Sequence, residues 1–200
     1  MSKNRNQTEQ NILLAVEQIL LNQGFSFIGI NAIARQAKCD KVLIYRYFNG
    51  LNGLLERFAE SRELWWSIDE IVTETKQDIS NYTLPEYLEL ILKRHINSIQ
   101  QKPLTQEIMA WELSEHNPLT ISLARLRAER GMLLLKQVRE FYQQPNIDIG
   151  GILGIFGAAI NYLIIRTRNT TLENAKEEWW RLEQTLSSLL SNQASLSDYN

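Results

Sequence analysis

Apolar residues recur three and four positions apart along most of this 200-residue chain, and short polar or proline-containing breaks separate the segments. This spacing places apolar side chains on one face of an α-helix. The clearest case is one face shared by Leu88, Ile91, Leu92, His95, Ile96 and Ile99. The pattern predicts an all-α protein with helices over residues 8–21, 30–37, 41–48, 51–66 (a continuation to 72 being open), 85–99, 103–115, 119–142, 147–168 and 172–190.

Residues 30–48 predict two short helices joined by a tight turn. The first helix presents small and apolar side chains on one face: Ile30, Ile33, Ala34 and Ala37. After a turn at residues 38–39, Asp40 is suited to cap the second helix, because its carboxylate can accept from free backbone N–H groups. Ile44 and Phe48 are expected to face inward. This is the pattern of a helix-turn-helix, which places its second helix in the DNA major groove.

The second helix of this motif leaves several side chains toward solvent. We expect these to form the DNA-binding surface: Lys41, Val42, Leu43, Tyr45, Arg46 and Tyr47. Cationic and tyrosine side chains can contact phosphates, Arg46 can also read guanine, and the aliphatic ones can touch thymine methyl groups. The alternative for the two tyrosines is packing against a neighbouring helix.

The segment from Ile33-Ala34-x-x-Ala37 to Leu43-Ile44-Tyr45-Arg46-Tyr47-Phe48 resembles the tetracycline-repressor (TetR) family of bacterial transcriptional regulators. The resemblance covers roughly residues 8–60 and rests on Ile12, Ala15, Gly24, Phe25, Ile33, Ala34, Ala37, Lys41, Ile44, Tyr45, Tyr47, Phe48, Leu54 and Leu55. It implies a three-helix DNA-binding head over residues 1–50. It also implies a helical ligand-binding and dimerisation body over residues 51–200.

Four positions depart from the family pattern. Lys38 stands where a glycine is usual in a left-handed turn, which costs a lysine about 1 kcal/mol. Ile28 and Leu51 replace a threonine and a lysine, and Leu43 replaces a small hydroxyl residue in the second helix. The losses at Ile28 and Leu51 remove polar groups that would contact the DNA backbone.

Charge is unevenly distributed along the chain. Residues 1–50 hold six Lys/Arg and three acidic residues, a net charge of +3, so the other 150 residues sum to −5 within a total of −2. This asymmetry fits a DNA-binding head on an acidic body. The single cysteine, Cys39, excludes an internal disulfide; we interpret it as a core residue of the turn, with a redox sensor as the alternative.

Nothing in the sequence indicates an enzyme. Nucleophile-elbow, phosphate-loop, dinucleotide and His-Glu-x-x-His motifs are absent, so we expect no catalytic residues, metal or cofactor. The polar start predicts a cytoplasmic location. Residues 149–165 carry no charge, which is the short limit for a membrane span. Their glycines instead favour a buried helix in a bundle, and we expect no membrane association.

Two C-terminal helices predict a homodimer. Small residues in residues 150–161 share one face, which allows a close helix approach, and the last helix is too apolar to stand alone. Both features suit a four-helix bundle built from two chains. The expected interface residues are Gly154, Gly157, Asn161, Trp179, Leu182 and Leu186. The alternative is that both helices only cover the core of their own subunit.

The body of such regulators usually holds a small-molecule site. Aromatic, Met and scattered polar side chains nominate Trp65, Tyr87, Ile91, His95, Met109, Glu112, Phe156 and Tyr162. The alternative is that these residues are ordinary core, with His95 a hydrogen-bonded core histidine. We therefore expect a homodimeric regulator, most simply a repressor, that binds a near-palindromic double-stranded operator and is released by a small-molecule effector. The alternative function is a helical dimer of the same fold that acts on a protein partner.

Overall fold

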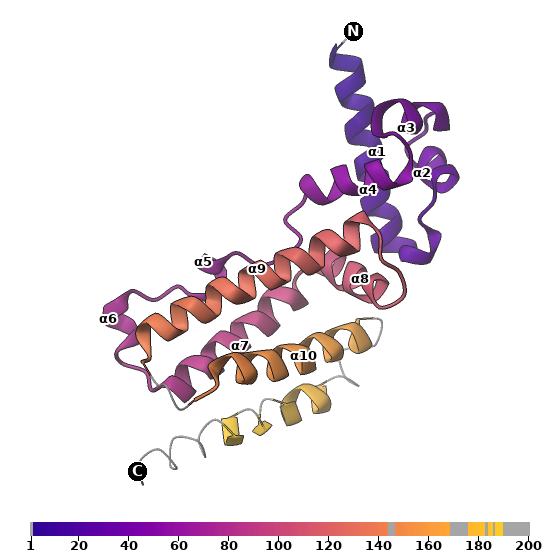
Figure 1. Cartoon of the computed structure of the whole chain (residues 1–200). Coiled ribbons are helices and arrows are strands. Elements are labelled where there is room, and N and C mark those ends of the chain that lie inside the picture. Colours follow the sequence, from indigo (N-terminus) through magenta and orange to yellow (C-terminus); the bar gives the residue numbers. More distant parts are fainter. Residues whose placement is uncertain (1, 144–146, 169–175, 183, 186, 190–200) are drawn as a thin grey trace. The chain divides into compact units, whose positions relative to one another are not determined.

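A computed structural model describes residues 2–143, 147–168, 176–182, 184–185 and 187–189 (Figure 1). Its regular structure in these ranges is entirely helical, which confirms the predicted all-α class. The elements are α1 (Ser2–Gln23), η1 (Phe25–Phe27), α2 (Ile30–Gln36), α3 (Lys41–Phe48), α4 (Leu51–Glu60), α5 (Ile68–Ile71), α6 (Lys76–Ile79), α7 (Leu84–Gln100), α8 (Pro103–Glu112), α9 (Pro118–Phe141) and α10 (Ile149–Thr167). The described residues of 176–189 are also helical.

The chain forms two compact units that are not contiguous in sequence. Unit 1 comprises residues 1–65 and 102–127, and unit 2 comprises residues 66–101 and 128–200. The expected head, residues 1–50, lies within unit 1. Unit 1 is larger than this head because α8 packs against α1 and η1. The functional division into a DNA-binding head (residues 1–50) and a ligand-binding body (residues 51–200) stays a prediction.

Unit 1 is built around α1. Ile12, Ala15, Val16 and Ile19 are all buried, at the spacing that places them on one face of the helix. Gly24 ends the helix with a backbone φ of 89°, a conformation that glycine adopts at little cost. Helix α2 packs across α1, and α3 and α4 pack together beside it.

The helix after the helix-turn-helix is shorter than predicted. Helix α4 ends at Glu60, and residues 61–67 run without helix to a new start at Ser67. Ser67 forms a reciprocal capping box with Glu70, which satisfies the free N–H groups of a new helix rather than continuing an old one. Leu64, in this connection, accepts a hydrogen bond of 2.9 Å from the buried Thr105 hydroxyl of α8.

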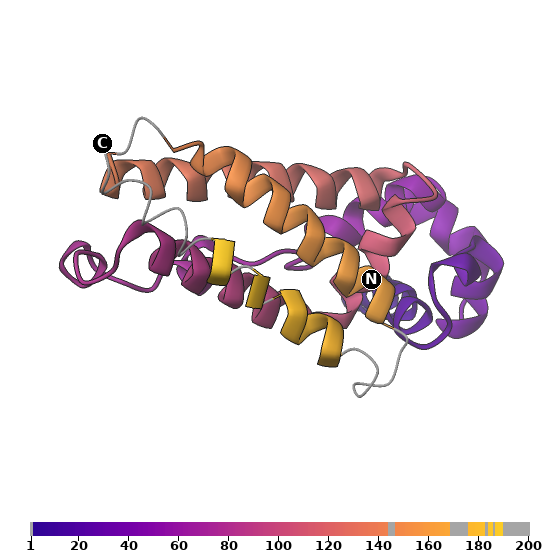
Figure 2. The same cartoon turned by 90° about the horizontal axis from the view of Figure 1, so that it is seen from below.

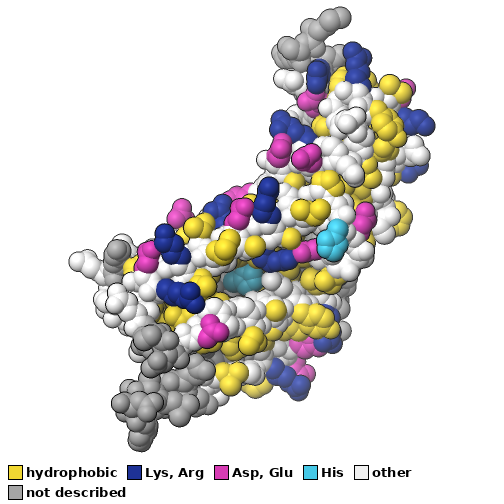
Figure 3. Space-filling view, viewed as in Figure 1, with side chains coloured by type: hydrophobic (Ala, Val, Ile, Leu, Met, Phe, Trp, Pro, Cys, Tyr) yellow, Lys and Arg dark blue, Asp and Glu magenta, His cyan; other side chains and the backbone are white. Residues whose placement is uncertain are grey.

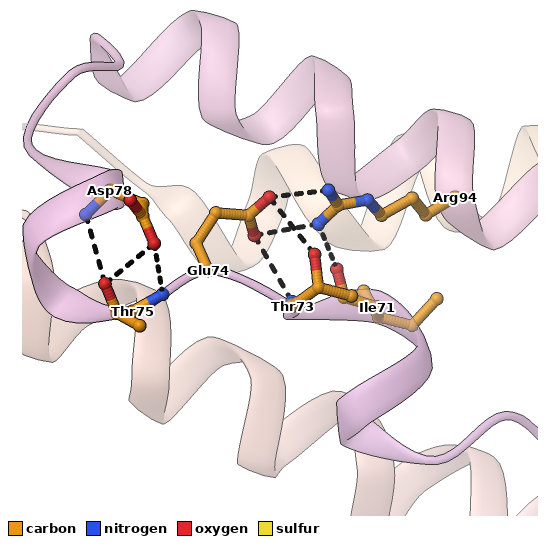
Figure 4. Close-up of polar contacts among 6 residues, drawn as sticks. All are labelled: Ile71, Thr73, Glu74, Thr75, Asp78 and Arg94. Atoms are coloured by element: carbon orange, nitrogen blue, oxygen red, sulfur yellow. Dashed lines mark hydrogen bonds and ion pairs between the residues drawn. The ribbon is translucent and has the colours of Figure 1, made fainter.

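Unit 2 is organised by α7, which buries one long face that includes Tyr87, Leu88, Ile91 and His95. Figures 1 and 2 both show α10 running beside α7. The connection from α5 to α6 is fastened to α7 by Arg94 (Figure 4).

The Arg94 guanidinium donates to both Glu74 oxygens, to one of them at 2.8 Å, and to the Ile71 carbonyl at 2.9 Å. The Arg94 hydrogen bonds hold the pKa of Glu74 below its ordinary value, against the opposing effect of burial. A second capping box, between Thr75 and Asp78, starts α6 immediately afterwards (Figure 4).

Helix α10 leaves most of its apolar surface uncovered. Its buried residues are Ile149, Ile160 and Ile164, whereas Ile155 is 72% exposed. Among the described residues, α10 is the one helix long and apolar enough to cross a membrane by length and composition, and 17% of the tested window is buried. The expectation of a buried helix in a bundle therefore stays a prediction, because α10 is only partly buried in the single chain.

Candidate nucleic-acid interface

Helix α3 presents the predicted DNA-binding residues on its outer side. Lys41, Val42, Tyr45 and Arg46 are exposed, with Val42 at 59% and Tyr45 at 56%. Leu43 and Tyr47 are half-buried. A helix that contacts base edges needs exposed side chains, and α3 exposes both aliphatic and aromatic ones. Lys and Arg side chains lie around this end of unit 1 (Figure 3).

The inner side of α3 anchors it as the sequence predicted. Ile44 and Phe48 are buried, and the Asp40 carboxylate accepts a hydrogen bond of 2.9 Å from the Val42 backbone N–H. Lys38 adopts a left-handed conformation with φ of 53°, so this lysine does occupy the position that favours glycine.

The end of α3 is held by a close approach to α4. A Cβ atom added at Gly53 would lie 1.9 Å from the Phe48 carbonyl oxygen. Gly53 is therefore the residue that lets α4 pass directly against the end of the candidate DNA-binding helix. Any larger residue here must displace one of the two helices.

Cys39, in the turn before α3, is half-buried. Burial raises the pKa of its thiol, and the neighbouring Asp40 carboxylate raises it further. A thiol held in its protonated form is a poor nucleophile, which argues against the redox-sensor alternative.

Helix α8 braces the entry to the helix-turn-helix, a role that the sequence patterns did not reveal. The Glu107 carboxylate accepts a hydrogen bond of 2.8 Å from the Phe25 backbone N–H, and the Phe25 ring stacks on Trp111 at a centroid distance of 5.8 Å. These residues are distant in sequence, so no local spacing signals their contact. The bracing fixes η1, from which the chain passes into α2.

The eight residues nominated for effector binding are divided between the units. Unit 1 holds Trp65 and Met109, both buried, and Glu112, which forms an ion pair of 2.6 Å with Arg127. Unit 2 holds the others. There Tyr87 and Ile91 are buried.

The remaining three nominated residues differ in environment. His95 is buried and accepts a hydrogen bond of 2.8 Å at Nδ1 from the Trp66 indole N–H. Its Nε2 therefore carries the proton and donates to Asn161 Oδ1 at 3.1 Å. Partners at both nitrogens favour the core interpretation of His95. Phe156 is half-buried, and Tyr162 is 61% exposed.

A surface depression of about 350 Å³ lies on α9, away from the nominated set. It is lined by Met132, Leu135, Lys136, Arg139 and Glu140. Within the described ranges, no three His, Cys, Asp or Glu side chains converge as a metal site would require.

The residues nominated for dimerisation lie on α10 and the last helical stretch. Gly154 is exposed, Gly157 is half-buried, and a Cβ at either would meet nothing within 4 Å. Asn161 is engaged by His95 within its own chain. Trp179 and Leu182 are half-buried, and Leu186 lies outside the described residues.

No protein-family model and no curated protein matches this sequence. Solved structures do match it along nearly their whole length. NalD of Pseudomonas aeruginosa, the secondary repressor of the MexAB-OprM multidrug efflux pump, shares 15% identity at a TM-score of 0.57, covering 92% of this chain and 95% of that one.

Two further solved structures show the same likeness. The fatty acid degradation regulator FadR of Bacillus halodurans shares 16% identity at a TM-score of 0.57, covering 92% and 94% of the two chains. A putative TetR-family transcriptional regulator of Rhodococcus sp. shares 18% identity at 0.57, covering 90% and 98%. The chain therefore has the fold of TetR-type regulators, which confirms the resemblance seen in the sequence.

Proposed function

We propose that this protein is a DNA-binding transcriptional regulator that binds a near-palindromic operator as a homodimer. The observation that carries the proposal is α3, a short helix that exposes Lys41, Val42, Tyr45 and Arg46 while Ile44 and Phe48 anchor it. Solved proteins of this fold are named as transcriptional regulators and repressors, which supports the same class of function here.

Helix α3 is the recognition helix in this proposal. Lys41 neutralises a backbone phosphate, Arg46 contacts either a phosphate or guanine, and Tyr45 and Tyr47 donate to phosphate oxygens. Val42 and Leu43 meet thymine methyl groups. One such helix reads only a few base pairs, so two copies related by a two-fold axis are needed for a specific site.

In this proposal, helix α10 forms the interface with the second copy of the chain. The exposed apolar face around Gly154, Ile155 and Tyr162 suits a partner helix, because small residues permit close approach and the flanking side chains become buried. Two helices from each chain then form a four-helix bundle. Covering this face also removes the apolar surface that a monomer would leave in water.

Repression and release complete the proposal. A dimer seated on a promoter blocks polymerase without needing a contact surface for it, so repression is the simplest outcome of binding. We take the body to have two conformations, one that binds the operator and one that does not. An effector that binds the second conformation more tightly lowers operator affinity, at most by the ratio of its affinities for the two conformations. Tyr87 and Ile91, which are buried on α7 within unit 2, are the nominated residues that we assign to that site.

The test is a gel-shift of the purified protein on DNA that flanks its own gene, at two salt concentrations with competitor DNA. A competitor-resistant shift on a near-palindrome is expected, and Arg46→Ala and Tyr47→Ala should weaken it. Arg181→Ala is the control, because Arg181 is an exposed arginine on the last helical stretch. Weak binding that is lost equally on all sequences would instead favour a protein partner.

The dimer is tested by sedimentation with a matched pair of variants. Gly154→Glu should dissociate the dimer, because it places a charge in the interface. Gly131→Glu should not, although Gly131 is also an exposed glycine inside a long helix with nothing within 4 Å of an added Cβ. A Gly154→Glu protein that stays dimeric would count against this interface.

A further inference from the structure

The start of α1 lies against the recognition helix. The guanidinium carbon of Arg5 is 5.1 Å from the centroid of the Tyr47 ring. This is the geometry of a cation–π contact, in which the ring face attracts the positive charge. Tyr47 is half-buried, and its aromatic ring supports Arg5 from the α3 side.

Glu9 holds Arg5 from the α1 side. The Arg5 Nε–H donates to Glu9 Oε1 at 2.6 Å, one helical turn further along. A guanidinium has five N–H donors. Among the residues that the structure describes, the terminal amino groups of Arg5 donate to no protein acceptor. The Arg5 side chain is 59% exposed, so these donors face water.

The contact with Tyr47 brings the Arg5 charge to the surface formed by α3. Tyr47 follows the exposed Tyr45 and Arg46 along the same helix. An arginine on α1 is not on the helix that enters the groove, so it would meet the phosphate backbone rather than base edges. A flat guanidinium with free terminal amino groups matches the oxygens of a phosphate.

We infer that Arg5 binds a DNA backbone phosphate and extends the interface beyond the helix-turn-helix, with Tyr47 as the residue that positions it. Glu9 holds the guanidinium through its Nε, which leaves the terminal amino groups for the phosphate. This inference rests on the proposed function, because it requires α3 to engage duplex DNA.

The test is the salt dependence of DNA affinity, measured by fluorescence anisotropy on the operator and on unrelated duplex. Each phosphate contact contributes about 0.9 to the slope of log K against log salt concentration. Arg5→Ala should therefore reduce the slope by about 2 for a dimer, and should weaken operator and unrelated DNA by similar factors. Arg181→Ala is the matched control, because Arg181 forms the same i,i+4 pair with Glu177 at 2.6 Å and is 70% exposed.

Three further variants test the positioning role of Tyr47 and the contact between Arg5 and Glu9. Tyr47→Phe keeps the aromatic face but loses the hydroxyl that we assign to a phosphate, so it should lower the affinity and keep the wild-type slope, because a neutral hydroxyl releases no counterion. Tyr47→Leu should also reduce the slope, as Arg5→Ala does. Glu9→Gln removes the charge of the ion pair with Arg5 and a negative charge near DNA, so it should tighten binding.

The outcomes distinguish this inference from the proposed function. If wild-type protein shows no competitor-resistant binding, both are overturned. If it binds specifically and Arg5→Ala retains the full slope, only the role of Arg5 is overturned. A change in the ratio of operator to unrelated affinity would show a base contact and overturn the assignment to phosphate.

Discussion

Replacement of Gly53 by alanine is the sharpest test of how the recognition helix is held. Alanine normally stabilises a helix relative to glycine by about 0.5–1 kcal/mol. Here the added Cβ would lie 1.9 Å from the Phe48 carbonyl oxygen, and real Cβ contacts are essentially never below 3.0 Å. The ends of α3 and α4 must therefore separate by about 1.1 Å, which is 3.0 minus 1.9.

That separation loosens a well-packed region. Phe48, Leu54 and Leu55 are buried around the contact. Overpacking of this kind typically costs about 1–3 kcal/mol. After the gain in helix propensity, we expect Gly53→Ala to destabilise unit 1 by about 1 kcal/mol. For a chain of this size, the melting temperature should fall by about 2–4 °C.

Gly131→Ala is the matched control, since it makes the same chemical change inside α9 where an added Cβ meets nothing within 4 Å. It should raise stability by about 0.5–1 kcal/mol. Thermal and urea unfolding followed by circular dichroism measure both effects, and Gly53→Ala should also lower operator affinity. If Gly53→Ala is as stable as Gly131→Ala, the close approach of α4 to α3 does not exist as described.

Other predictions concern pH and buried polar groups. Arg94 lowers the pKa of Glu74 below its ordinary value of 4.5, so this stabilisation is present above that pH and is lost as the pH falls through the folded-state value. Arg94→Met should flatten the acid dependence of the urea midpoint, and an unchanged profile would contradict this. Tyr87→Phe removes a buried hydroxyl with no hydrogen-bond partner among the described residues and should stabilise by about 1 kcal/mol in urea unfolding. Tyr142→Phe should destabilise by about 1 kcal/mol in that assay, because its hydroxyl donates to a backbone carbonyl at 2.9 Å; equal midpoints for the two variants would refute both. Lys38→Gly should stabilise the folded protein by about 0.5 kcal/mol, because it removes the cost of a left-handed lysine but adds the backbone entropy that a glycine loses on folding. A loss of stability would show that Lys38 makes compensating contacts.

Local signals in the sequence located α3 correctly because its determinants are adjacent in the chain. Asp40 caps the helix, and Ile44 and Phe48 lie four apart on its buried face. The apolar run through Trp65 and Trp66 predicts a longer α4 than the structure has, whereas Ser67-x-x-Glu70 is a capping box that starts a new helix.

The sequence by itself determined the helical class, most helix bounds, and α3 with most of its exposed residues, because periodicity and capping act within a few residues. It could not determine which distant residues meet. The contacts of Arg5 with Tyr47, Glu107 with Phe25 and His95 with Asn161 join residues far apart in the chain. Only the tertiary structure decided these pairs, since a helix face specifies that a side chain is buried but not the partner against which it is buried.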